Sequence, residues 1–248
     1  MVASTVRSAV AQPLAEILRR GSHRPYTARM SEPCACPPDR PPTDVERIAQ
    51  HFDERMRDWQ PVCPESTDLL FGWLEREGLS GSTVMDVGCG TGELIVRALD
   101  AGATRATGAD LSSEAIAQAS AQMREAGFED RVDLWVGDAA VEALEPHDVV
   151  VLDKVICCYP DADALIARST AAAGRLYAFA VPESRGVWGL IARARWFVFD
   201  LVARLRGEDH PRFIHERADV EAKVLAAGFR PLHTGRQFVW FVGVYARR

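Results

Sequence analysis

From Ser82 onward, the chain alternates between two patterns of apolar residues. Short apolar runs typical of β-strands are followed by longer segments in which apolar residues recur at helical spacing. This alternation predicts right-handed crossovers and a parallel sheet, and a wholly apolar run such as 149–152 fits a strand covered on both faces. We expect an α/β fold with a seven-stranded, mostly parallel sheet, an antiparallel last strand, and helices on both faces. The expected strands are 83–87, 106–109, 132–136, 148–152, 176–181, 229–233 and 237–245, and the expected helices are 43–59, 65–77, 92–99, 112–126, 161–172, 186–206 and 217–227.

Local signals mark both ends of this region. Thr43-Asp-Val-Glu46 is a capping box, in which a side-chain oxygen accepts from a free amide and the glutamate reaches back, so we expect the first helix to begin there. Near the other end, Thr234-Gly235 separates two apolar runs and predicts a hairpin turn. The last run is apolar on both faces, so we expect its strand to lie inside the sheet.

Residues 1–42 differ in composition from the rest of the chain. Residues 1–30 are rich in Arg, Ser and Ala, and they resemble an organelle-targeting presequence. The alternative, which we prefer, is an upstream extension of the reading frame with Met30 as the true start. Residues 31–42 are rich in proline and are typical of a disordered linker. We therefore expect a disordered or leader-like extension over 1–42 and one folded domain over 43–248.

The overall composition argues against several classes of protein. Hydrophobic residues make up 48% of the chain and charged residues 26%, which is ordinary for a soluble enzyme. The net charge of −6 gives no electrostatic reason to expect a nucleic-acid partner. No apolar run is long enough to span a bilayer, so we expect no integral membrane segment. The six cysteines lack the spacing of a metal site, and they favour reduced thiols in the cytoplasm with no metal.

The strongest chemical signal is the glycine-rich turn Asp86-Val-Gly88-Cys89-Gly90-Thr-Gly92, which follows the first expected strand. Glycine tolerates positive φ and lets another molecule approach the backbone, so a ligand should lie across this turn. Dinucleotides favour GxGxxG, whereas the spacing here is GxGxG. Asp86 would repel a pyrophosphate, but it can pair with an ammonium group such as that of S-adenosylmethionine (SAM). Electrostatics therefore favours SAM as the cofactor.

Two further acidic residues follow the next two expected strands. Asp110, followed by Leu111, can accept hydrogen bonds from both ribose hydroxyls. Asp138 can accept one from an adenine amino group, while the Ala139 amide donates to the ring. Taken singly, either aspartate could be a helix cap. Because parallel strands end at one edge of a sheet, we expect these carboxylates and Asp86 to converge on the same rim.

In the SAM-dependent methyltransferases that these residues resemble, the loop after the fourth strand faces the methyl group that is transferred. Asp153 and Lys154 are candidates for contacting the methionyl end of the cofactor or the substrate, and Tyr159 for orienting the acceptor. The alternative is that residues 155–158 only pack and that Lys154 lies in solvent. His215 is a candidate catalytic base or acceptor-binding group, with a purely structural histidine as its alternative.

These residues resemble the class I SAM-dependent methyltransferases over about residues 45–245. Asp86–Gly92 resembles the first motif of that family, Asp110 the second and Asp138 the third. The resemblance implies a doubly wound, Rossmann-like sheet and methyl transfer from SAM. A non-catalytic interaction protein of the same fold is one alternative. A nucleotide-dependent oxidoreductase is another, although Glu93 stands where its third glycine would be.

The C-terminal half is similar to magnesium-protoporphyrin methyltransferases in residues 177–182, 213–221 and 226–229. Where that family tends to show His before Tyr-Pro, this chain has Cys158, so the resemblance implies only the fold, the cofactor and a bulky acceptor. The segment 187–205 is rich in aromatic residues and arginines. It predicts a lid over a small, hydrophobic or anionic acceptor, or a peripheral membrane contact, with an ordinary packed helix as the alternative.

Overall fold

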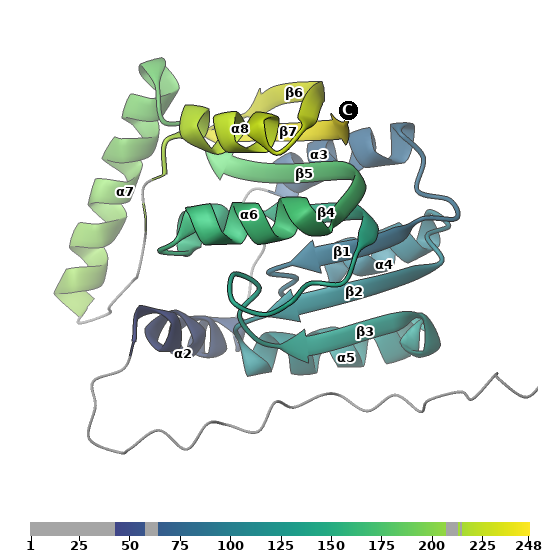
Figure 1. Cartoon of the computed structure of the whole chain (residues 1–248). Coiled ribbons are helices and arrows are strands. Elements are labelled where there is room, and N and C mark those ends of the chain that lie inside the picture. Colours follow the sequence, from purple (N-terminus) through teal and green to yellow (C-terminus); the bar gives the residue numbers. More distant parts are fainter. Residues whose placement is uncertain (1–42, 58–63, 207–212, 214) are drawn as a thin grey trace, which may run out of the picture.

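The computed structural model describes residues 43–57, 64–206, 213 and 215–248. Within this part of the chain, seven strands form one sheet in the order β3-β2-β1-β4-β5-β7-β6 (Figure 1). The pairs from β3 to β5 are parallel, whereas β7 is antiparallel to both β5 and β6. This confirms the expected mostly parallel, Rossmann-like sheet with an antiparallel last strand. The strands are β1 (Thr83–Val87), β2 (Arg105–Asp110), β3 (Val132–Val136), β4 (His147–Asp153), β5 (Ala173–Pro182), β6 (Phe229–Gln237) and β7 (Trp240–Arg247).

Helices cover both faces of the sheet (Figure 1). Successive side chains of a strand point to opposite faces, and β1 shows the consequence. Val84 belongs to the apolar core formed with α3, α4 and α5, whereas Met85 belongs to the core formed with α6 and α8. The helices are α2 (Asp44–Met56), α3 (Pro64–Arg76), α4 (Glu93–Asp100), α5 (Ser113–Ala126), α6 (Ala162–Ala172), α7 (Gly186–Arg206) and α8 (Arg217–Ala226), with a short 3-10 helix, η2, at Ile156–Cys158.

The capping box at the start of α2 is present as the sequence predicts. The Thr43 hydroxyl accepts from the Glu46 amide at 3.2 Å, and the Glu46 carboxylate accepts from the Thr43 amide at 2.7 Å. The helix ends at Met56, three residues before the expected end at Trp59, and 58–59 lie outside the described residues. The predicted extension over 1–42 also lies outside them.

The hairpin turn predicted at Thr234-Gly235 is wrong. Both residues lie inside β6, and the turn falls between Gln237 and Trp240, where Phe238 has a φ of 52°. Gly235 serves packing instead, because a Cβ there would lie 2.9 Å from Cη2 of Trp73 on α3. The expectation for the last strand is confirmed, since β7 lies between β5 and β6.

Helix α7 leaves the layered body of the domain. Figure 1 shows it standing along the edge at which the parallel strands end, away from both helix layers. Near its start, the buried residue Ala192 packs with Val239 and Trp240 of the β6–β7 turn and with Cys157 of η2. In the described part of the chain, no helix is long and apolar enough to cross a membrane.

Candidate cofactor and active site

The glycine-rich turn after β1 is held against the end of β2. The amides of Gly88 and Cys89 both donate to the Ala109 carbonyl, at 2.7 and 3.1 Å. Gly88 has a φ of 72°, and a Cβ there would lie 2.4 Å from Cγ2 of Val155. This position therefore requires glycine for both its backbone conformation and its close packing.

The next two glycines differ in what surrounds them. Gly92, with a φ of 86°, precedes α4 and would bring a Cβ within 2.9 Å of Met123. Gly90, with a φ of 53°, has no atom within 4 Å of the position of a Cβ. The backbone at Gly90 is thus the open part of the turn. Cys89 is buried, and burial followed by the nearby Asp110 and Asp86 raises the pKa of its thiol well above the ordinary value, so it stays protonated.

Asp86 is a buried carboxylate in an acidic neighbourhood. Its exposed fraction is 3%, and no hydrogen bond or ion pair to it occurs in the part of the chain that the structure describes. Burial raises the pKa of Asp86 well above its ordinary value, and the charges of Asp153 and Asp110 raise it further. Three carboxylates from β1, β2 and β4 therefore meet at one edge, where a cation would relieve their repulsion.

Asp110 fixes the turn and the start of α5. One oxygen accepts from the Gly90 amide and the other from the Ser112 amide, both at 2.9 Å. Burial raises the pKa of Asp110 despite these hydrogen bonds. Behind it, Asp53 of α2 accepts from the Ser112 hydroxyl at 2.6 Å and from the Glu114 amide at 3.0 Å. Asp53 was not predicted, because nothing local in the sequence of α2 indicates this contact.

Asp138 at the end of β3 is already engaged within the protein. One oxygen accepts from the Ala140 amide at 2.9 Å, and the other accepts from the Tyr159 hydroxyl at 2.8 Å. Burial and then this hydrogen bond raise the pKa of Tyr159, so its phenol stays protonated. Ala139 is buried beside Asp138, and Leu111 is half-buried. The roles of Asp138 and Ala139 toward adenine stay predictions.

Asp153 and Lys154 form a compact cluster with Thr67 of α3. One Asp153 oxygen accepts from the Thr67 hydroxyl at 2.6 Å and from the Lys154 ammonium at 2.9 Å. The other Asp153 oxygen is buried and has no partner among the described residues. Lys154 has a φ of 64° and a side chain that is 15% exposed, so the alternative that it lies in solvent is wrong. Thr67 was not predicted from the sequence.

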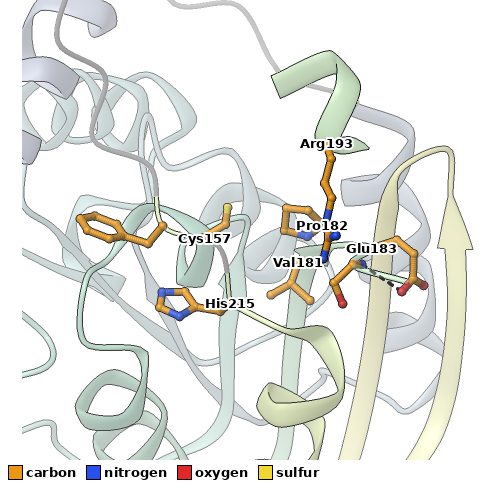
Figure 2. Close-up of a pocket in the computed structure, with 8 residues that line it drawn as sticks. Cys157, Val181, Pro182, Glu183, Arg193 and His215 are labelled. Atoms are coloured by element: carbon orange, nitrogen blue, oxygen red, sulfur yellow. Dashed lines mark hydrogen bonds between the residues drawn. The ribbon is translucent and has the colours of Figure 1, made fainter. Parts of the chain in front are cut away.

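A small pocket, open to solvent, lies near this cluster under the start of α7. Figure 2 shows Arg193 reaching into it from α7, opposite His215 and Cys157. His215 Nε2 lies 2.8 Å from the Tyr159 carbonyl, which can only accept, so this nitrogen carries the proton. The pocket is lined by Cys157, Val181, Pro182, Glu183, Ser184, Arg193, Phe213 and His215.

The charged side chains of the pocket are paired. Glu183 lies 3.4 Å from the Arg217 guanidinium, and Arg193 lies 3.8 Å from Glu216. Within the described residues, Cys89, Cys157 and Cys158 form no disulfide, and the sulfurs of Cys157 and Cys158 are 3.8 Å apart. The Sγ of Cys157 donates toward the Lys154 carbonyl over 3.4 Å. The hydrogen bond with Cys158 and then burial raise the pKa of Cys157 well above its ordinary value, so neither contact makes it a thiolate. Cys34, Cys36 and Cys63 lie outside the described residues.

Comparison with known proteins identifies the core of this fold. Residues 84–173 match a family described as "Methyltransferase domain". A segment of 86 residues, 35% of this chain, is 38% identical to the ribosomal protein L11 methyltransferase of Escherichia coli (strain SMS-3-5 / SECEC). Over residues 84–173, the chain is therefore similar to class I SAM-dependent methyltransferases. The matched segment spans only 29% of the length of that relative.

The chain is also similar to solved structures across most of its length. Magnesium protoporphyrin IX methyltransferase from Synechocystis PCC 6803, solved with bound SAH, has a TM-score of 0.65 at 19% identity and covers 81% of this chain and 98% of its own. Geranyl diphosphate C-methyltransferase from Streptomyces coelicolor A3(2) has a TM-score of 0.61 at 14% identity and covers 85% and 100%. At these identities the likeness shows the fold alone, and it confirms the resemblance to magnesium-protoporphyrin methyltransferases at that level.

Proposed function

We propose that this methyltransferase domain transfers the methyl group of SAM to a small hydrophobic or anionic acceptor seated in the pocket under α7. The observation that carries the proposal is Asp86, a buried carboxylate without a partner among the described residues. Asp110 and Asp153 lie close enough to raise its pKa. A ligand with an ammonium and a sulfonium group supplies the positive charge that this edge lacks. A pyrophosphate would add to the repulsion instead.

Each residue at the strand ends would bind a different part of such a ligand. Asp86 would pair with the amino group of the methionyl part, and the open backbone at Gly90 would let the ligand approach closely. Asp110 would accept from the ribose hydroxyls. Asp138 would contact adenine, beside the amide of Ala139. Lys154, held by Asp153, would face the methionyl carboxylate or the acceptor.

The pocket residues favour an acceptor with an apolar body and a negative group. Val181, Pro182 and Phe213 line the pocket with apolar groups. Arg193 pairs with Glu216 and can bind an anionic ligand in its place.

An acceptor oxygen attacks the methyl carbon as the carbon–sulfur bond breaks, so the protein mainly aligns the reactants and excludes water. SAM supplies the activated methyl group and its own leaving group. A carboxylate acceptor is ionised near neutrality and needs no base.

His215 and Tyr159 would help to position the acceptor. His215 donates from Nε2 to the Tyr159 backbone, which leaves Nδ1 as the basic nitrogen of the neutral ring. An acceptor that must lose a proton could use this atom. The Tyr159 hydroxyl is bonded to Asp138, so it ties the acceptor loop to the cofactor site.

The proposal is tested by labelling. The purified chain is incubated with deuteromethyl-SAM and a fractionated cell extract, and small molecules, protein and RNA are analysed separately by mass spectrometry. We expect label on a small hydrophobic acid, and no label with the Asp86→Asn variant. With the purified acceptor, Arg193→Gln should raise KM for the acceptor while the Kd for SAM is unchanged. Label confined to protein or RNA would overturn the proposed acceptor class.

A further inference from the structure

Helix α7 presents an apolar face that no described part of the chain covers. Leu190 is 69% exposed and Phe197 is 70% exposed. Between 186 and 202, Gly189 and Ala192 are the only buried residues among those whose exposure the structure describes. The exposed apolar residues of the helix are Val187, Trp188, Leu190, Ile191, Phe197, Val198, Leu201 and Val202.

The spacing of these residues shows which way the apolar face points. Gly189 packs so tightly on the backbone of Ser184 that a Cβ would lie 2.4 Å from its carbonyl carbon, and Ala192 packs on the β6–β7 turn. These two residues define the side toward the body. At 3.6 residues per turn, Val187, Leu190 and Val198 fall on the opposite side. The apolar face therefore points away from the acceptor pocket, which receives only Arg193 from this helix.

Basic residues border this face. Arg193 and Arg195 fall on either side of the apolar stripe at helical spacing. The helix carries four arginines and one aspartate, whereas the whole chain has a net charge of −6. Helix α7 therefore combines a net positive charge with exposed apolar residues, in a chain that is acidic overall.

The turn between β6 and β7 places another exposed aromatic residue beside the start of α7. Phe238 at this turn is 48% exposed, and its ring lies 6.0 Å from that of Trp188 at the start of α7. The guanidinium of Arg236 lies 4.1 Å from the centre of the Trp188 ring. Aromatic rings beside arginines are typical of groups that lie at a membrane–water interface.

We propose that α7 docks this protein on the surface of an anionic lipid bilayer, with its apolar face among the acyl chains and its arginines at the phosphates. An interfacial helix combines an apolar face with basic borders, because long cationic side chains reach the headgroups while apolar ones enter the hydrocarbon. Two copies that paired through α7 would bring its arginines close to each other, so the charge excess of the helix favours an anionic bilayer over a symmetric dimer at this face.

The docking is tested by co-sedimentation of the full chain with vesicles, in the absence of SAM. We expect binding to vesicles of phosphatidylglycerol and phosphatidylcholine in equal parts, and much weaker binding to pure phosphatidylcholine. The double variant Phe197→Glu/Leu201→Glu should lower partitioning at least about tenfold. Arg195→Gln should lower it about fivefold and reduce its dependence on salt.

Matched variants isolate the helix from residues 1–42, which all proteins in the series share. Phe197→Leu keeps an apolar side chain and should bind like the wild type. Val141→Glu adds one glutamate, half the charge of the double variant, at an exposed apolar position off α7 and should also bind like the wild type. Absent or equal binding to the two kinds of vesicle would overturn the proposal, as would binding unchanged by the double variant. So would a dimer in light scattering that the double variant abolishes, since that would assign the face to a second copy.

Discussion

The Tyr159 hydroxyl donates a hydrogen bond to Asp138 Oδ2 over 2.8 Å, and this contact joins the loop after β4 to the end of β3. In the proposed site, this contact places the tyrosine on the side of the cofactor. We expect Tyr159→Phe to raise the Kd for SAM about fivefold, the worth of one typical hydrogen bond. At saturating SAM, the rate of a single turnover should stay within about a factor of two.

Calorimetry and rapid-quench kinetics separate the two roles proposed for Tyr159. A fall in the single-turnover rate with an unchanged Kd for SAM would show that the phenol orients the acceptor directly. Phenylalanine keeps the buried ring, so the comparison isolates the hydroxyl.

The two glycines of the turn should respond differently to alanine. Gly88→Ala adds left-handed strain and a clash with Val155, and we expect a loss of about 3 kcal/mol of unfolding free energy. Gly90→Ala meets open space and should cost about 1 kcal/mol. If a ligand crosses the turn at Gly90, the second variant should nevertheless bind SAM at least about tenfold more weakly. Urea denaturation and calorimetry measure both quantities.

A second-site change checks the packing argument at Gly88. Val155→Ala removes the atoms that the new methyl group would meet, so it should recover part of the stability of Gly88→Ala. The two changes would be additive if the clash were not the cause.

Asp53 ties α2 to the start of α5 through the Ser112 hydroxyl and the Glu114 amide. We expect Asp53→Ala to lower the unfolding free energy by about 1 kcal/mol, as for the loss of a helix cap. Asp53→Asn keeps an acceptor oxygen and should lose less. Equal stability of the wild type and the alanine variant in urea would show that this contact contributes nothing.

The pH dependence of stability should carry the signature of Asp86. Its pKa in the folded protein is raised above the ordinary value of 3.8, so its contribution to stability is present below that value and is lost as pH rises through the folded pKa. Asp86→Asn has no such loss. Without ligand, the variant should be more stable than the wild type at neutral pH by about 1 kcal/mol or more, with the difference shrinking in acid.

Thermal unfolding of both proteins across pH measures this difference. A variant less stable than the wild type at neutral pH would mean that the Asp86 carboxylate has a stabilising partner. In that case the Asp86 carboxylate would not need a bound cation to compensate its charge.

The glycine-rich turn and the acidic residues at the strand ends could be predicted from the sequence. Their signals are local, because a parallel topology places the ends of its strands at one edge of the sheet. Contacts between distant segments had no such signal. Thr67 and Asp153 are 86 residues apart, and Asp53 and Ser112 are 59 apart. The prediction misplaced the hairpin turn because Gly235 is required for close packing against Trp73, a residue distant in the sequence, and not for a turn.

The outward direction of α7 could not be predicted either, since apolar residues occur all around that helix. Only the close packing of Gly189 and Ala192 shows which side meets the body. A lid and a docking helix have the same composition, and their orientation distinguishes them.

Titration calorimetry of SAM with the wild type and with Asp86→Asn, in two buffers of different ionisation enthalpy at neutral pH, tests the central claim most directly. A cation that pairs with a carboxylate of raised pKa favours its ionised form, so binding to the wild type should release protons and weaken as pH falls. Asp86→Asn should bind at least about tenfold more weakly, without that proton release. Equal affinity for the two proteins would contradict the account.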